Sequence, residues 1–114
     1  METIKKIISY KSNLENIKFI IEPGYASQGE CVVRFPTTDI KIEMDIATTS
    51  VIAIKPKSET IMVLGKIFPA PGKTMVLMTF KIKENEQIIF TETYEKTLDA
   101  FDRFSYIFSL VKSK

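Results

Sequence analysis

The chain has 114 residues, close to the commonest size of a single domain, and 45% of them are hydrophobic, which is enough to build a core. Its 16 basic and 14 acidic residues are spread along the sequence, without the basic block that is typical of nucleic-acid-binding domains. The lack of histidine removes the commonest general acid–base residue and metal ligand, and the single cysteine, Cys31, excludes an intrachain disulfide.

The first half of the chain is dominated by patterns typical of β-strands. Residues 3–10 form either a strand or a short helix, and the sequence leaves both open. Residues 17–21 and 30–35 are rich in β-branched and aromatic side chains and flank a glycine-containing loop, so they predict two strands. Residues 39–46 alternate charged and apolar side chains, which predicts a strand with one buried and one wet face.

Strand patterns continue through the middle of the chain. Residues 51–54 form a short strand that ends before Pro56. Residues 60–68 and 74–83 are two apolar runs separated by a proline- and glycine-containing stretch, which predicts a hairpin. Residues 75–80 are apolar at successive positions, so this strand is central or covered on both faces. With a further strand at 87–92, we expect about seven strands.

The last segment, residues 93–112, predicts one amphipathic helix. Its apolar side chains recur at spacings of three and four, from Tyr94 to Val111, and Thr93 is a suitable N-cap. The fold class is therefore mainly β (α+β). We expect a single domain, 1–114, in which a strongly curved antiparallel sheet or small barrel is capped by this C-terminal helix.

Two features indicate a binding surface. On the predicted helix, Tyr106 and Leu110 lie one turn apart on an otherwise polar face that includes Arg103, so they contact either a partner chain or another part of the fold. Tyr25 lies in a loop between two glycines and is either a binding anchor or part of a plain turn; we favour the turn.

Other charged or reactive residues have simpler interpretations. Cys31 is expected to be a small buried hydrophobe. Two lysine pairs could hold an anion, but we favour protection of edge strands. Two carboxylate pairs are expected to be solvated instead of catalytic. The pairs are Lys55 with Lys57, Lys81 with Lys83, Glu43 with Asp45, and Asp99 with Asp102.

The layout resembles three families. A meander of strands closed by a C-terminal helix resembles pleckstrin-homology-like domains, without a shared motif. Residues 45–54, the later hairpin and residues 101–111 resemble the second half of a PilZ-type barrel. Of that signature only Asp45 is matched, because Ala47 replaces its serine and Ser50 its glycine, so cyclic di-GMP binding is not implied. The order of strands, long hairpin and final helix is similar to SecB-like chaperones.

These observations favour a non-enzymatic protein-binding module: an adaptor, inhibitor or small chaperone-like protein that binds a protein partner or a second copy of itself. The alternative is a small β-barrel that binds an apolar or anionic small ligand, for which the five methionines would suit an apolar pocket. We expect no catalytic residue, cofactor or metal, and the sequence does not suggest a nucleic-acid partner. The apolar runs are too short to span a bilayer and no signal peptide is evident, so we expect a cytoplasmic protein.

Overall fold

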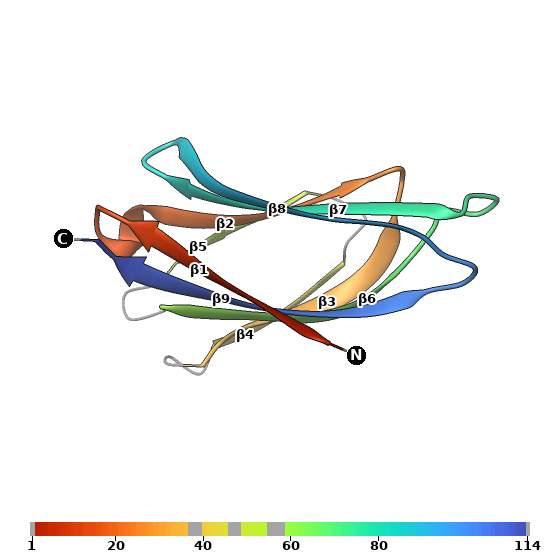
Figure 1. The fold of residues 1–114 in the computed structure, drawn as a ribbon, viewed down its shortest axis with the longest axis horizontal. Coiled ribbons are helices and arrows are strands. Elements are labelled where there is room, and N and C mark those ends of the chain that lie inside the picture. Colours follow the sequence, from red (N-terminus) through yellow and green to blue (C-terminus); the bar gives the residue numbers. More distant parts are fainter. Residues whose placement is uncertain (1, 37–39, 46–48, 55–58, 114) are drawn as a thin grey trace.

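The structure, a computed structural model, describes residues 2–36, 40–45, 49–54 and 59–113, with side chains throughout except in 40–45. Nine strands form two sheets that face each other as a β-sandwich (Figure 1). The five-stranded sheet has the order β1-β9-β6-β3-β4 and the four-stranded sheet the order β5-β2-β7-β8. The elements are β1 (Thr3–Tyr10), a 3-10 turn (Leu14–Asn16), β2 (Ile17–Gly24), β3 (Gln28–Phe35), β4 (Ile40–Asp45), β5 (Ser50–Ala53), β6 (Thr60–Phe68), β7 (Met75–Glu84), β8 (Gln87–Thr97) and β9 (Asp102–Lys112).

The core lies between the two sheets and is rich in aromatic rings. Phe80 of β7, in the four-stranded sheet, packs against Tyr106 and Phe108 of β9, in the five-stranded sheet, with ring centroids 4.8 and 5.5 Å apart. Phe19 of β2 stacks on Phe80 at 5.9 Å. Edge-to-face and offset ring pairs add to the stabilisation that burial of their apolar surface already gives. This ring cluster therefore joins the two sheets.

Strand pairing is antiparallel except at one place. β1 runs parallel to β9, with Thr3 opposite Ser105 and Tyr10 opposite Lys112. β1 is an edge strand of its sheet and β8 an edge strand of the other, and they border the same open side of the sandwich (Figure 1). Lys6 of β1 and Glu92 of β8 form an ion pair of 3.4 Å across that side.

The predicted C-terminal helix is wrong. Residues 93–97 complete β8, residues 98–101 connect, and Asp102–Lys112 is β9. Phe104, Tyr106, Phe108 and Leu110 are all buried and recur at a spacing of two, which is the period of a strand with one buried face. The spacings of three and four were a coincidence of aromatic residues that belong to two strands and the loop between them.

The curved or closed single sheet is also wrong. The described strands form two open sheets, with no closed barrel, and there are nine of them instead of about seven. The predicted hairpin of residues 60–68 and 74–83 does not exist, because β6 and β7 belong to different sheets. The tight hairpin is β7–β8, in which Asn85 and Glu86 both have positive φ, 50° and 69°. Positive φ at both central residues is the geometry of a type I′ turn.

Several strand predictions are confirmed. Residues 60–68 coincide with β6, residues 17–21 and 30–35 lie within β2 and β3, and residues 3–10 are a strand. β7 is central in its sheet, as its apolar run indicated. The predicted strand 39–46 is β4 at 40–45, and its two end residues lie outside the described part, as do Lys55 and Lys57. Among the described residues, no helix is long and apolar enough to cross a membrane.

Candidate functional site

The outer face of the five-stranded sheet carries a diagonal row of apolar side chains, although no other element of the described chain covers it. On the central strand β6, Ile61 and Val63 point into the core, so Met62 and Leu64 point outward and are 37% and 52% exposed. We call the row the outer strip. It consists of Ile7, Val32, Met62, Leu64 and Ile107.

The strand register makes the outer strip continuous. Met62 lies directly opposite Ile107 of β9, and Leu64 lies directly opposite Val32 of β3. Directly opposed side chains in a sheet are in contact distance, and diagonal neighbours are within reach of long side chains. Ile7 of β1 pairs with Ser109 and is therefore the diagonal neighbour of Ile107; its side chain is 76% exposed.

Cations surround the outer strip. Lys5 lies opposite Ile107, Arg34 lies opposite Met62, and Lys66 lies opposite Arg103. The Lys66 ammonium lies 4.2 Å from the centroid of the Phe101 ring. Among the described outward positions of β1, β3, β6 and β9, the remaining charged residue is Glu30, opposite Lys66. Four cations and one carboxylate therefore border the strip.

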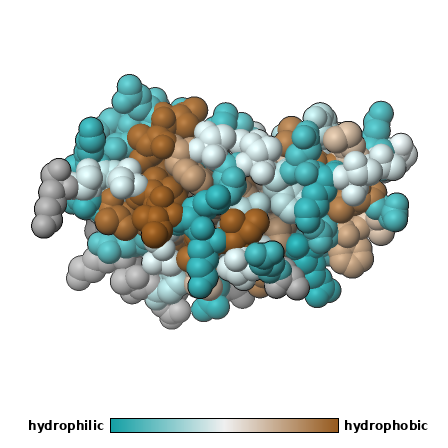
Figure 2. Space-filling view, in the orientation of Figure 1, coloured by the Kyte–Doolittle hydropathy of each residue, from teal (hydrophilic) through white to brown (hydrophobic). Residues whose placement is uncertain are grey.

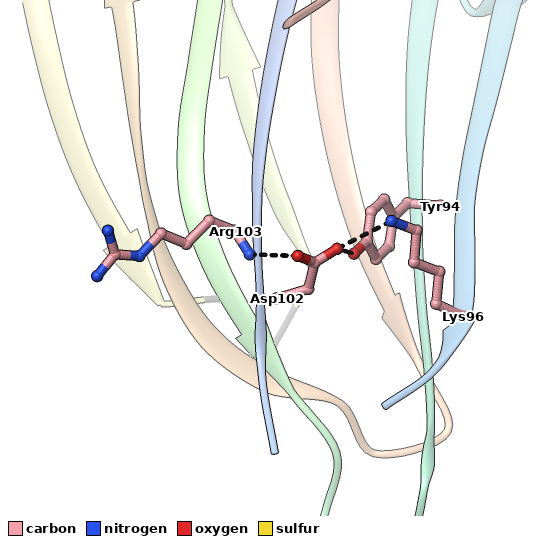
Figure 3. Close-up of polar contacts among 4 residues, drawn as sticks. All are labelled: Tyr94, Lys96, Asp102 and Arg103. Carbon is pink, nitrogen blue, oxygen red and sulfur yellow. Dashed lines mark hydrogen bonds and ion pairs between the residues drawn. The ribbon is translucent and has the colours of Figure 1, made fainter. Parts of the chain in front are cut away.

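A polar cluster joins the sheets near the β8–β9 connection (Figure 3). The Tyr94 hydroxyl of β8 donates a hydrogen bond to the Asp102 carboxylate of β9, and the Lys96 ammonium lies 3.0 Å from the same carboxylate. The backbone N–H of Arg103 donates to the other Asp102 oxygen at 2.9 Å. The cluster therefore ties one sheet to the other at one end of the sandwich.

The protonation states of this cluster suit a structural clamp better than acid–base chemistry. The hydrogen bonds from Tyr94 and Lys96 hold the pKa of Asp102 below its ordinary value. Burial and the hydrogen bond to Asp102 raise the pKa of Tyr94 well above its ordinary value. Asp102 thus stays ionised and Tyr94 stays protonated at neutral pH, and neither is poised to exchange a proton there.

The structure separates the four residues predicted as partner contacts. Tyr106 and Leu110 are 2% and 3% exposed and lie in the core. Because residues 102–112 form a strand and not a helix, these two side chains are not available to a partner. Arg103 is exposed and points to the same side of the sheet as the outer strip. Tyr25 is 51% exposed in the β2–β3 turn, and its hydroxyl donates to Glu95 at 2.7 Å. Tyr25 therefore contacts β8 of the four-stranded sheet, whereas Arg103 lies on the outer face of the five-stranded sheet.

The sequence signal for the outer strip was the run Ile61-Met62-Val63-Leu64. Four consecutive apolar residues in a strand must place two on each face. Such strands are usually buried on both faces. The run alone does not predict the strip, because the register that brings Val32 and Ile107 alongside Met62 and Leu64 is not visible in the sequence.

Other reactive or charged groups do not assemble a chemical site in the described part of the chain. Cys31 is buried, as expected, and burial raises the pKa of its thiol to about 11, so it is not a ready nucleophile. Lys81 pairs with Glu22 at 2.9 Å, and Lys83 lies 4.0 Å from Glu86. No group of three metal-ligating side chains occurs among the described residues.

The open side of the sandwich is a second apolar surface. Figure 2 shows apolar colour over the part of this side where β1 ends and β8 begins. Ile88, which pairs with Lys83 near the start of β8, is 50% exposed. The strand β8 carries a register shift opposite Ile82 and Lys83, and Glu92 points toward the space between the sheets. Bulges and inward charges protect edge strands against pairing with another chain. This side is therefore less suited to binding than the outer strip.

Comparison with known proteins gives no relative: no family model, no curated protein and no solved structure matches the chain.

Proposed function

We propose that the protein is a non-enzymatic protein-binding module. The observation that carries the proposal is a central strand, β6, that is apolar on both faces in a sheet of which the described elements cover only one face. Antiparallel sheets with one wet face normally alternate apolar and polar side chains. A continuous apolar row on the open face is typical of a surface that another protein covers.

The polar groups favour binding over catalysis. The Tyr94–Asp102 cluster holds fixed protonation states, and the Cys31 thiol is buried. Recognition of a protein needs no reactive group, only a desolvated apolar centre with a polar rim. The outer strip with its surrounding cations has that composition.

The test compares two double variants with matched chemistry. Met62→Ser with Leu64→Ser removes the centre of the outer strip, and Val51→Ser with Met75→Ser removes two exposed apolar side chains of the other sheet. Proteins crosslinked to the tagged wild type in its own cells are identified, purified and titrated against all three forms by calorimetry. We expect the first variant to lose at least tenfold in affinity and the second to bind as the wild type does.

Denaturant unfolding is the control for both variants. Substitution of exposed side chains outside special structural features changes the free energy of unfolding by about 0.5 kcal/mol or less per site. A much larger loss in the strip variant would mean that Met62 and Leu64 stabilise the fold, and equal affinity of all three forms would place binding elsewhere. If no captured protein binds directly to the purified wild type, the protein-binding proposal is wrong.

A further inference from the structure

We infer that the outer strip and its cations bind an acidic polypeptide segment that carries apolar side chains. This rests on the proposed function and adds the surface and the chemistry of the partner. The segment would lie across β1, β9 and β6, with apolar side chains on the strip and carboxylates over Lys5, Lys66 and Arg103.

The ion pairs of the described chain distinguish this face from the rest of the molecule. Each described ion pair lies on the four-stranded sheet, at the open side of the sandwich, or in the polar cluster around Asp102. None lies on the outer face of the five-stranded sheet. These pairs are Lys6–Glu92, Lys18–Glu86, Lys81–Glu22, Lys83–Glu86 and Lys96–Asp102. By contrast, Lys5, Arg34 and Arg103 form no ion pair within the described chain. Of the described cations away from this face, five are paired within the chain, whereas Lys11, Lys73 and Lys112 are not. Lys5, Arg34 and Arg103 differ from those three because they lie together around one apolar row.

The distribution of charge sets where the carboxylates of the segment lie. Among the described outward side chains, the carboxylate of Glu30 is on β3, while Lys5 and Arg103 are on β1 and β9, in the other half of the sheet. At physiological ionic strength, charges separated by more than about 8 Å are largely screened. The half built by β1, β9 and β6 thus presents an almost wholly cationic rim.

Two other ligands, single-stranded nucleic acid and a second copy of the chain, fit this surface less well than an acidic segment does. Single-stranded nucleic acid needs a series of rings on which its bases stack. The members of the outer strip are aliphatic or methionine, and the ring of Phe101 beside it already contacts the Lys66 ammonium. A second copy of the chain in face-to-face packing would bring its own four cations to the same interface, where like charges oppose association. An acidic segment gains from both the apolar row and the charges.

The test uses a phage-displayed library of random linear peptides, selected on the full-length protein, with the selected peptides then synthesised and titrated by fluorescence anisotropy. We expect peptides in which Asp and Glu flank two or three large apolar residues. Lys5→Glu with Arg103→Glu should weaken their binding at least tenfold, and so should Leu64→Ser. Lys73→Glu with Lys112→Glu makes the same change in net charge at exposed sites away from the strip and should change binding less than twofold.

Salt and oligomeric state complete the test. The dissociation constant of the selected peptides should rise severalfold when the concentration of sodium chloride is increased, because salt screens exposed charges. Selected peptides without acidic enrichment, or equal binding by both charge variants, would overturn the inference while leaving the protein-binding proposal in place. A dimer of the wild type that Leu64→Ser dissociates, or binding of a single-stranded oligonucleotide that depends on Lys5 and Arg103, would also overturn it.

Discussion

At the scale of single residues, the contact between Tyr94 and Asp102 is, like the Lys6–Glu92 ion pair, a polar link between two sheets whose core contacts are mainly apolar. Hydrogen bonds to an ionised group contribute about 1.5–3 kcal/mol each when buried. The Asp102 side chain is 33% exposed, so solvent screening reduces that contribution. We expect Asp102→Ala to lower the free energy of unfolding at neutral pH by about 1–2 kcal/mol, measured by urea denaturation.

The difference in the free energy of unfolding between the wild type and Asp102→Ala should change with pH in a definite direction. Because folding lowers the pKa of Asp102, the stabilisation is complete above the unfolded pKa, about 4, and is lost as the pH falls through the folded pKa. The gap between wild type and Asp102→Ala should therefore narrow in acid. Tyr94→Phe, which keeps the ring, should cost less when Asp102 is already alanine. A gap that widens on acidification would contradict the assigned charge state.

The sequence predicted single-residue environments unevenly. Burial of Cys31 followed from its apolar neighbours and is confirmed. A helical period predicts Tyr106 and Leu110 on a mainly polar face, whereas the period of the observed strand puts both side chains in the core. Whether a side chain is buried can be predicted from the sequence only when the periodicity of its helix or strand is predicted correctly.

At the scale of elements, β9 shows how the two periods compete. Its even positions from 104 to 110 are buried and its odd positions are polar or half-buried, which a spacing of two describes completely. The aromatic residues of β8 and of the connecting loop happened to extend a three-and-four spacing across two strands. Long segments rich in Phe, Tyr, Ile and Val favour strands when both periods fit.

The β7–β8 turn is under local strain that substitution can relieve. Glu86 has φ of 69°, which disfavours residues with a Cβ and suits glycine. Its ion pairs with Lys18 and Lys83 involve a side chain that is 74% exposed, so they contribute little. We expect Glu86→Gly to raise the free energy of unfolding by about 0.5 kcal/mol, measured by thermal and denaturant unfolding.

The matched control for that turn is Glu86→Gln, which removes the charge and keeps the Cβ at the same φ. It should leave stability unchanged or slightly lower. If Glu86→Gly and Glu86→Gln lower stability equally, the ion pairs outweigh the backbone strain and the prediction is wrong.

At the scale of the whole molecule, the β-rich class could be predicted, but the pairing of strands could not. The local patterns of single strands are visible in the sequence, as alternation in residues 39–46 and as an apolar run in residues 60–68. Whether β6 and β7 pair or separate into two sheets depends on contacts between distant segments, such as β6 with β3 and β9. The outer strip depends on the same long-range register, so it too became visible only in the folded chain.

Because β1 and β9 are parallel, the force needed to separate them should depend on the direction in which the molecule is pulled. A force applied between the N-terminal end of β1 and the C-terminal end of β9 pulls the two strands past each other along their axes. All eight register pairs, from Thr3 with Ser105 to Tyr10 with Lys112, then carry the load at once. If the handles are instead attached at Lys11→Cys and Lys112→Cys, the same pairs open one after another from a single end.

Single-molecule force spectroscopy should therefore record a higher unfolding force through the termini than through the two cysteine handles. Cys31 is buried and the pKa of its thiol is about 11, so it should remain unlabelled while the exposed handles react. Equal forces in both geometries would show that another part of the sandwich yields first. If the forces differ as expected, the protein resists extension through its two termini and unfolds at a lower force when it is pulled from the C-terminal ends of β1 and β9.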